Sequence, residues 1–367
     1  MTSEYEIAFA LVRGMSVDLA RKILDVVESE QNFFVLKQSE LEGIIGAKNR
    51  ILESAYRNEI LEKAHREMEF VNANSIDLYY FRDAAFPQRM LLDAIDAPIL
   101  LFGKGPVNLN AARLVSVVGT RHATQYGKAI TDKIIGELAE MYPDVMIVSG
   151  LAYGIDVAAH QASLAHSVST IAILGHGLNT IYPATHRSVA VDMLRHNGAL
   201  LSEYTSQDAI HRGNFLARNR IVAAISDCTL VVESAVKGGA MVTASIANSY
   251  NRDVLAVPGR ANDPFSMGCN ALIRDNKASL VTCADDIANV MRWPKPKPKV
   301  PVEQSLFPEY TDEEKLIIDF LTQHGECHVN DIACHLNVPI HTLLSQLVDM
   351  EFNGYVRAVP GSRYTLA

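Results

Sequence analysis

Hydrophobic and polar residues alternate along the middle of the chain in a repeating order of short strands and longer helices. Between residues 113 and 291, short apolar runs rich in β-branched residues are separated by stretches with helical periodicity. Such runs are typical of parallel strands that are covered on both faces. The predicted strands are Leu114–Val118, Val145–Ser149, Thr170–Leu174, Ala199–Ser202, Thr229–Val232, Val254–Val257 and Ser279–Val281. The pattern predicts an α/β fold with a doubly wound sheet, whose ligands are expected at the carboxyl ends of its strands.

The segments on the amino-terminal side of this region have a different pattern. Residues 1–70 place apolar residues at helical spacing, and turns at Gly14 and Gly46 resemble the hairpins of helix-hairpin-helix modules. An ordinary helical packing module is the simpler interpretation of the same residues. We predict a helical domain of the helix-hairpin-helix or SAM-like kind at residues 1–70, followed by the doubly wound α/β domain at residues 71–291.

A linker rich in proline and lysine at residues 292–310 precedes a last domain at residues 311–367. Prolines keep such a linker extended. Thr311 and Glu314 have the spacing of a capping box, which marks the start of a helix. The pattern that follows predicts three helices and a two-stranded wing, so we predict a winged-helix domain.

The recognition helix of this winged-helix pattern is expected at Pro339–Phe352. It contains Asp349 and Glu351 but no lysine or arginine. DNA phosphates would repel a helix with this charge. The sequence therefore predicts a protein-contact or regulatory role for the last domain.

The composition is that of a globular protein in a reducing compartment. The 367 residues are 49% hydrophobic and carry a formal net charge of −9. The five cysteines are an odd and scattered set, which predicts buried thiols in a reducing cytoplasm rather than a disulfide framework. Without a long apolar run or a signal-peptide pattern, the sequence predicts a cytoplasmic protein that does not contact a membrane. The negative charge still allows a local basic groove.

A predicted anion site lies directly after the first predicted strand. Gly119 permits a sharp turn, and Thr120 and Arg121 follow before a helical pattern begins near Thr124. A strand that leads through glycine into a helix exposes free N–H groups at the positive end of the helix dipole. Arg121 adds a permanent forked cation. Small residues after other strands are expected at the same edge and are counted as site residues: Ser149, Gly150, Gly238 and Gly239.

Residues 209–226 concentrate positive charge, with three arginines and no acid in a chain that is acidic elsewhere. The candidate site residues of this stretch are Arg212, Phe215, Arg218, Asn219 and Arg220. Cations interleaved with an aromatic ring suit a single strand, whose phosphates need neutralising and whose bases need a stacking face. Alternatively, Arg218 and Arg220 are structural partners of buried acids such as Glu203 and Glu233.

Other ligand chemistries have little support. No P-loop sequence is present, and the glycines at Gly175 and Gly177 lack the third glycine of the dinucleotide fingerprint. Two Cys-His dipeptides, beginning at Cys327 and Cys334, lack the cysteine spacing of a zinc site. We expect neither a cofactor nor a metal.

Asp156 and His160 are four residues apart and would share one face of a helix. They could form an acid–base pair. Alternatively, Asp156 orders the turn before its helix and His160 is its packed neighbour. We favour the second interpretation and predict no catalytic residue.

The motifs together closely resemble those of the DNA-processing protein A family, also called DprA or Smf. They cover about residues 80–290 in the order of the family. The motifs are Val118-Gly-Thr-Arg121 with Tyr126-Gly127, Ser149-Gly-Leu-Ala-Tyr-Gly-Ile-Asp-Val-Ala-Ala-His160, Tyr182-Pro183, Ser202-Glu-Tyr204, Phe215-Leu-Ala-Arg-Asn-Arg220, Ala256-Val-Pro-Gly259 and Gly268-Cys-Asn-Ala-Leu-Ile273. The chain departs from the family at Leu216, where proline is usual, and at Ala240, where serine is common.

The resemblance implies that residues 71–291 form an extended Rossmann-like domain, which binds single-stranded DNA without cutting it. It also implies protection of incoming DNA and loading of the RecA recombinase during natural transformation, generally by a homodimer. By motif match, Arg121 would contact a phosphate, and Arg218 and Arg220 would shape or line the groove. Arg212 and Phe215 are added as DNA contacts because of their charge and aromatic character.

A second function remains open for the same broad fold. Nucleoside-monophosphate phosphoribohydrolases use a Gly-Gly-x-Gly-Thr-x-x-Glu loop. The segment that begins at Gly238 and contains Thr243 keeps the glycines but has no glutamate to act on a ribose. The basic stretch at residues 209–226 favours single-stranded DNA over this enzyme.

Overall fold

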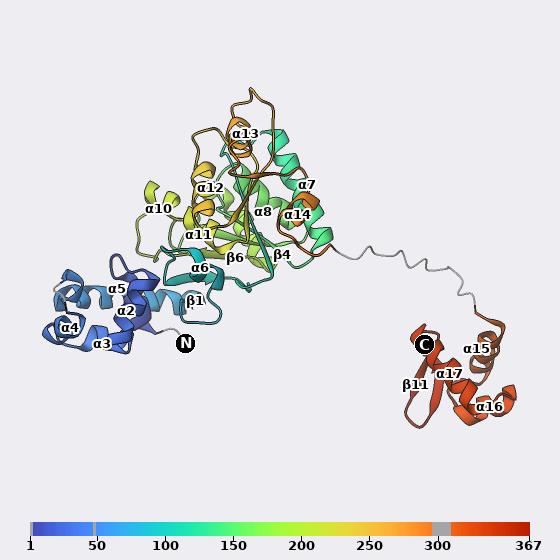
Figure 1. The fold of residues 1–367 in the computed structure, drawn as a ribbon. Coiled ribbons are helices and arrows are strands. Elements are labelled where there is room, and N and C mark those ends of the chain that lie inside the picture. Colours follow the sequence, from blue (N-terminus) through green and yellow to red (C-terminus); the bar gives the residue numbers. More distant parts are fainter. Residues whose placement is uncertain (1–2, 47–48, 296–309) are drawn as a thin grey trace. The chain divides into compact units, whose positions relative to one another are not determined.

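The computed structural model describes residues 3–46, 49–295 and 310–367. The chain divides into two compact units, Met1–Pro296 and Lys297–Ala367 (Figure 1). Most of the linker predicted at residues 292–310 lies outside the described residues. No helix of the described ranges combines the length and the apolar character that crossing a membrane requires.

A nine-stranded sheet is the centre of the first unit, in the order β1-β2-β6-β5-β4-β3-β7-β8-β9. Each predicted strand is present to within one residue at either end. The strands are β3 (Arg113–Val118), β4 (Val145–Ser149), β5 (Ser169–Leu174), β6 (Ala199–Ser202), β7 (Cys228–Val231), β8 (Asp253–Ala256) and β9 (Ser279–Leu280). These seven strands pair with one another in parallel throughout. The predicted α/β fold with a large parallel sheet is confirmed.

Two strands that the sequence pattern did not predict extend the sheet. β1 (Asp77–Tyr80) pairs with β2 (Leu100–Lys104), and β2 pairs antiparallel with β6, so that Phe102 lies opposite Ser202. Glycine and lysine in β2 and a short polar start in β1 obscure the strand pattern in the sequence. Burial against the sheet nevertheless stabilises both strands.

The chain order of the parallel strands creates a switch point between β3 and β7. Strands β4 to β6 follow β3 on one side, whereas β7 to β9 continue on the other. Loops that leave the carboxyl ends of β3 and β7 therefore diverge and open a crevice, which is where ligands of such sheets bind.

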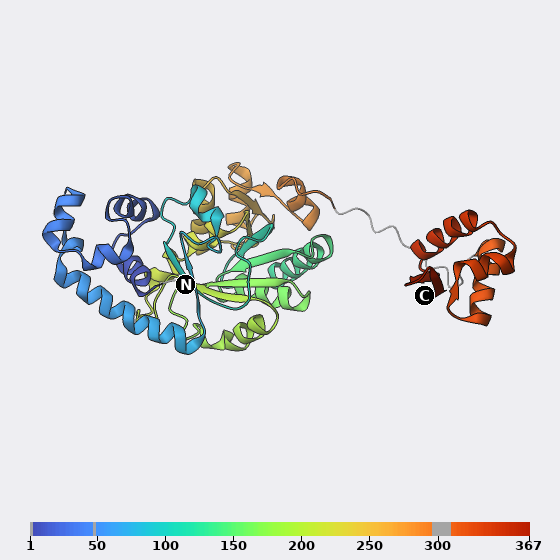
Figure 2. The same cartoon turned by 90° about the horizontal axis from the view of Figure 1, so that it is seen from below.

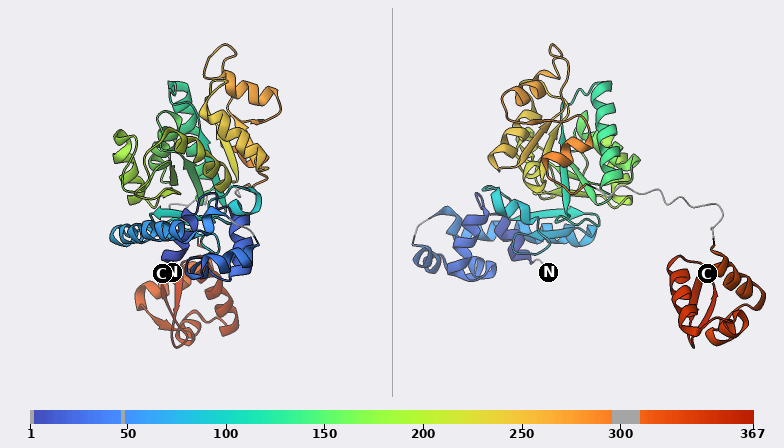
Figure 3. Two further views of the ribbon diagram at one scale, coloured as in Figure 1. Left: turned by 90° about the vertical axis from the view of Figure 1, so that its left-hand side faces the viewer. Right: turned by 45° about the vertical axis from the view of Figure 1, so that its right-hand side comes forward.

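Helices cover both faces of the sheet. α7 (Gln125–Met141), α8 (Ile155–Ala165) and α14 (Ala284–Val290) share one core with Val115 and Val117 of β3. α11 (Asn219–Ile225) and α12 (Gly239–Ser249) share the other with Leu114 and Val118. Alternate residues of one strand thus point to opposite cores, and Figures 1 and 3 show α7 and α12 on opposite sides of the sheet.

The amino-terminal residues form a helical segment that continues the second core. Its helices are α1 (Glu4–Leu11), α2 (Val17–Val27), α3 (Glu30–Val35), α4 (Gln38–Ile45), the short 3-10 turn η1 (Arg50–Leu52) and α5 (Ser54–Asn74), the long helix in Figure 2. The buried guanidinium of Arg57 donates to the backbone carbonyls of Leu52, Phe33, Phe34 and Leu36. One side chain therefore provides hydrogen-bond donors for backbone carbonyls at the ends of two helical segments, α3 and η1.

The second unit has its own apolar core. It contains α15 (Asp312–His324), β10 (Cys327–His328), α16 (Val329–Leu336), α17 (Ile340–Phe352), β11 (Val356–Val359) and β12 (Arg363–Leu366). The strands form a sheet in the order β10-β12-β11. Thr311 and Glu314 make both hydrogen bonds of the predicted capping box.

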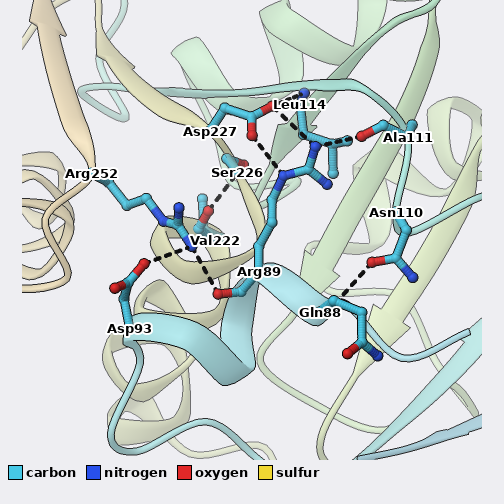
Figure 4. A network of polar contacts seen from close by, with 10 residues as sticks. All are labelled: Gln88, Arg89, Asp93, Asn110, Ala111, Leu114, Val222, Ser226, Asp227 and Arg252. Atoms are coloured by element: carbon cyan, nitrogen blue, oxygen red, sulfur yellow. Dashed lines mark hydrogen bonds and ion pairs between the residues drawn. The ribbon is translucent and has the colours of Figure 1, made fainter. Parts of the chain in front are cut away.

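A polar network fixes the edge of the large sheet at which the parallel strands begin (Figure 4). α6 (Gln88–Asp93) supplies Arg89, whose Nε lies 2.6 Å from Oδ1 of Asp227. Oδ2 of Asp227 accepts from the backbone N–H of Leu114 at 2.7 Å, and Nη2 of Arg252 donates to the carbonyl of Arg89 at 2.8 Å. The starts of β3, β7 and β8 are thereby tied to α6.

Removing the cation from this network should destabilise the sheet. Arg89→Met leaves the half-buried carboxylate of Asp227 without its cation, so the free energy of unfolding should fall by about 3 kcal/mol. Urea unfolding followed by the fluorescence of Trp293, the only tryptophan, measures this. The control Arg82→Met removes a 3.7 Å pair from a side chain that is 58% exposed, and should cost less than about 1 kcal/mol. Equal losses would mean that the network does not fix the edge.

Candidate functional site

Loops from three strands interlock at the switch point. The loop after β3 lies between the others, because the N–H of Thr120 donates to the carbonyl of Glu233 after β7 at 2.7 Å. The carbonyl of Thr120 accepts from the N–H of Ile155 after β4 at 3.1 Å. Gly154 has a φ of +81°, and a Cβ there would lie 2.1 Å from the Thr120 carbonyl oxygen. The β3 loop is therefore held rigidly, with Arg121 at its outer end.

Three helices begin at this edge, and two of them are already neutralised by carboxylates of the chain itself. Glu233 is buried and accepts from the N–H of Thr124 at 2.9 Å, as well as from its hydroxyl, at the start of α7. Asp156 is buried in the first turn of α8. The first turn of α12 has Gly238 as its N-cap and no side-chain cap. Its N–H groups and positive dipole end thus remain available to an anion.

Arg218 is a buried support of the site. It is 3% exposed, and its guanidinium donates to the carbonyl of Ile173 at the end of β5. A Cβ at position 150 would lie 2.0 Å from Nη1 of Arg218, so Gly150 gives this guanidinium its space. Burial raises the pKa of Asp156 and lowers that of Arg218, whereas their mutual attraction opposes both shifts. We conclude that the two opposite charges stabilise each other beneath the site.

Four exposed cations surround this buried pair. They are Arg121, Lys128, Arg212 and Lys237. Within the part of the chain that the structure describes, none of the four makes an ion pair within 4.0 Å. Their charges are therefore available to an external anion, unlike those of Arg89, Arg220 and Arg252, which pair with acids of the first unit.

Three adjoining hollows of about 380, 530 and 450 Å³ meet at Arg121, which lines all of them. We call them together the basic furrow. The first hollow extends to the start of α12 and the second runs along α7 and α8. Charged and aromatic residues that line the basic furrow are Arg121, Lys128, Tyr153, Asp156, Tyr182, Arg212, Phe215, Arg218, Lys237 and Phe265.

Aromatic rings form one wall of the third hollow. Phe215 belongs to α10 (Arg212–Ala217), and its ring centroid lies 5.4 Å from that of Tyr182. Gly175 lets α10 approach the end of β5, because a Cβ there would lie 2.9 Å from Cδ1 of Phe215. Tyr153 and Tyr182 are about half exposed, at 48% and 51%. These rings offer flat apolar faces beside free cations.

Most of the small residues serve packing rather than ligand approach. A Cβ at Gly119 would lie 2.4 Å from Ile155, and one at Gly127 would lie 2.1 Å from Glu233. At Gly239, by contrast, a Cβ would meet no atom within 4 Å. The close backbone approach that the sequence suggested is therefore mainly between loops of the protein itself, and the start of α12 is the open exception.

The structure brings most of the predicted site residues together. Those that line the first hollow are Gly119, Thr120, Arg121, Arg212, Phe215, Arg218, Asn219, Gly238 and Gly239, and Gly150 lines the third. Ser149 is buried instead and donates to the carbonyl of Val117 at 2.6 Å. Arg220 binds Glu203 and lies 3.9 Å from Asp96, which matches the alternative interpretation of a structural ion pair.

Sequence reasoning missed several lining residues. Lys128 and Lys237 are single lysines in ordinary surroundings, and Tyr153 and Tyr182 lie within motifs that were noted for their glycine and proline. Tyr153 and Lys237 follow predicted strands within about five residues, and Lys128 lies in the first turn of α7, which is the signal that was present. Tyr182, further from a predicted strand, had no such signal.

The comparisons with known proteins agree on one family. A protein-family model described as DNA recombination-mediator protein A matches residues 77–292. The DNA processing protein DprA of Streptococcus pneumoniae is 33% identical over 78% of this chain and 97% of its own length. The protein Smf of Escherichia coli is 34% identical over 76% of this chain and 75% of its own length.

Solved structures give the same result. The X-ray structure of DprA from Streptococcus pneumoniae superposes with a TM-score of 0.65 at 32% identity, over 78% of this chain and 98% of that one. A structure that describes the single-stranded DNA binding mode of DNA processing protein A from Helicobacter pylori has a TM-score of 0.51 at 29% identity. It covers 59% of this chain and 95% of that one.

His160 lies beneath the basic furrow and is fully buried. The hydroxyl of Thr170 donates to the carbonyl of Ile147 at 2.9 Å and therefore accepts from Nδ1 of His160 at 2.7 Å. Nε2 has no partner among the described residues. Burial, together with the charge of Arg218, lowers the pKa of His160 to about 3. The neutral ring is a packed neighbour of the site rather than a proton donor.

This burial should make stability depend on pH. The folded-state pKa lies below the usual value near 6.5, so the unfolded chain binds the proton first and stability falls as the pH drops below about 6.5. Between pH 7 and pH 5, His160 should contribute a loss of about 2 kcal/mol that is absent in His160→Asn. Urea unfolding of both proteins at the two pH values measures the difference. An equal drop in both would show that His160 is not held neutral.

Proposed function

This chain belongs to the DNA recombination-mediator protein A family, and on that premise we propose that it binds single-stranded DNA along the basic furrow without cutting it. The observation that carries this proposal is the meeting of four unpaired cations, an uncapped helix start and half-exposed aromatic rings at one edge of the sheet. Phosphates and bases of a flexible strand are the ligand that needs all three.

One phosphate would lie at the start of α12, where backbone N–H groups and Lys237 face the first hollow. Arg121 lines all three hollows, so it is placed to hold the next phosphate along the strand. Arg212 and Lys128 extend the positive potential in two directions. Arg218 acts indirectly, because its buried guanidinium positions the segment that carries Arg212 and Phe215.

Bases would stack against the aromatic wall. Tyr182 and Phe215 form a tilted pair beside Tyr153, and their exposed faces suit any base. Recognition by stacking and by charge is independent of sequence, as a protein that handles DNA of any origin requires.

The chemistry of the site suits binding rather than catalysis. The carboxylates nearest the basic furrow have structural partners: Glu233 caps α7, Glu203 binds Arg220, and Asp156 faces the charge of Arg218. The alternative function, a phosphoribohydrolase, would require a free carboxylate that reaches the ribose of the substrate. The furrow as described offers free cations instead.

We extend the proposal to the wider role of the family members that the sequence resembles. The protein would process DNA in natural transformation, protect incoming single strands and load the RecA recombinase, acting as a homodimer. The exposed furrow supports the protective role, because a bound strand would lie with its phosphates neutralised along an otherwise acidic surface.

The flanking segments are proposed as separate domains with other tasks. Residues 1–70 would be a helix-hairpin-helix-like packing domain, which is supported by Gly14 and Gly46 at positive φ; it packs against the sheet through a shared core. Residues 311–367 would be a winged-helix domain with the β11–β12 hairpin as its wing.

Removing the central cation should weaken binding to every single strand alike. Arg121→Ala should reduce affinity by about 10- to 100-fold, the value of one or two charge-assisted hydrogen bonds. The slope of log affinity against log salt should become shallower by about 0.7 for each phosphate released. Fluorescence anisotropy with labelled oligonucleotides across salt concentrations measures both. Arg195→Ala, on a surface pair with Asp192 in α9 (Arg187–Arg195), is the control and should change neither. A wild-type slope for Arg121→Ala would remove Arg121 from the interface.

The aromatic wall gives an independent test. Tyr182→Ala should lower affinity for single strands by about 1–3 kcal/mol, the value of one stacked base, and should leave the salt slope unchanged. Tyr182→Phe keeps the ring and should bind like the wild type. The same titrations distinguish the results, and a loss in both variants would assign the effect to the hydroxyl rather than to stacking.

A further inference from the structure

The helix α17 of the second unit exposes a continuous apolar ridge. Ile340, Leu344, Val348 and Phe352 recur every four residues, and their exposed fractions are 46%, 38%, 58% and 93%. The neighbouring face, with Leu343, Leu347 and Met350, is fully buried in the core of the unit. An ordinary surface helix would carry polar side chains on its outer face. Four large apolar side chains in one row on that face are typical of a surface that binds another molecule.

Charge on and around the ridge restricts what can bind there. Asp349 lies three residues before Phe352, and Glu351 lies three residues after Val348, so an acid borders the ridge on each side. Glu313 reaches the same helix through a hydrogen bond from Gln346. Residues 310–367 contain eight acids and only three bases. Of the three bases, Lys315 and Arg363 pair with acids of the unit itself.

These observations exclude two of the possible occupants on physical grounds. A DNA backbone would meet carboxylates and an apolar surface where it needs cations. A second copy of the same ridge would bring the acids of both copies together. A helix with an apolar row bordered by lysine or arginine is complementary to the ridge in both apolar surface and charge.

We propose that the ridge Ile340–Leu344–Val348–Phe352 is a docking surface for a basic amphipathic helix of a partner protein. The apolar rows of the two helices pack against each other, and the basic side chains of the partner face Asp349 and Glu351. The binding site is thus separate from the basic furrow and independent of the function proposed for it.

The test uses the full-length protein and a designed, fluorescein-labelled helical peptide with leucine at every fourth position and lysine on either side. Fluorescence anisotropy should show saturable binding that weakens with salt. Val348→Ser combined with Phe352→Ser should weaken it by about tenfold or more, because the apolar area at the centre of the contact is lost. Both side chains are exposed, so these substitutions leave the core intact.

Matched controls distinguish specific binding at the ridge from non-specific hydrophobic binding of the peptide. Leu92→Ser combined with Ile95→Ser removes apolar side chains that are 77% and 82% exposed in the first unit, and should leave peptide binding unchanged. A peptide with glutamate in place of lysine, and one with its leucines scrambled, should bind at least about tenfold more weakly. Equal binding of the glutamate peptide, or an unchanged affinity of the ridge variant, would overturn the proposal.

Two further measurements identify the other occupants. If the ridge substitutions convert a dimer into a monomer in sedimentation velocity, the ridge binds a second copy of the chain and the proposal fails. If they reduce affinity for single-stranded oligonucleotides, the ridge belongs to a DNA interface and the proposal fails as well. Unchanged sedimentation and unchanged DNA affinity, together with lost peptide binding, are the supporting result.

Discussion

The arrangement of the basic furrow depends on the buried guanidinium of Arg218. It donates to the carbonyl of Ile173, fills the space that Gly150 leaves open, and faces the charge of Asp156. A buried cation is costly unless opposite charge and hydrogen bonds offset its desolvation. The charge of Asp156 and the carbonyl of Ile173 offset part of this cost, although Nε of Arg218 has no partner among the described residues. Because Arg218 lies between α10 and α11, its fixed position also fixes α10, which carries Arg212 and Phe215 to the rim of the furrow.

The same principle explains how an acidic protein can present a positive surface. The carboxylates near the carboxyl edge of the sheet are used internally: Glu233 caps α7, Glu203 binds Arg220, and Asp156 stabilises Arg218. The exposed cations are left without partners among the described residues. The net charge of −9 therefore describes the molecule as a whole, whereas the potential of the furrow is set by a few unpaired side chains.

Much of the fold could be predicted because local sequence carries its signal. Apolar, β-branched runs predicted all seven parallel strands, and the spacing of Thr311 and Glu314 predicted the start of α15. β1 and β2 were missed because they depend on pairing with β6 rather than on their own composition. The site was predicted to the extent that its residues follow strand ends. For Arg220 the sequence left two interpretations open, a DNA contact or a partner of an acid such as Glu203, because it does not show which residues lie beside an arginine. The structure pairs Arg220 with Glu203.

The sequence by itself determined the α/β class, the edge of the sheet at which ligands are expected, and the family to which the chain belongs. These follow from periodicities and motifs that are contained within short segments. Only the tertiary structure decided which small residues are open to a ligand and which arginines are free. Both depend on atoms from remote segments, as when Glu233 fills the space beside Gly127 and Arg218 fills the space above Gly150. Whether a side chain is available to a ligand is a property of its surroundings, and these exist only once the loops have packed.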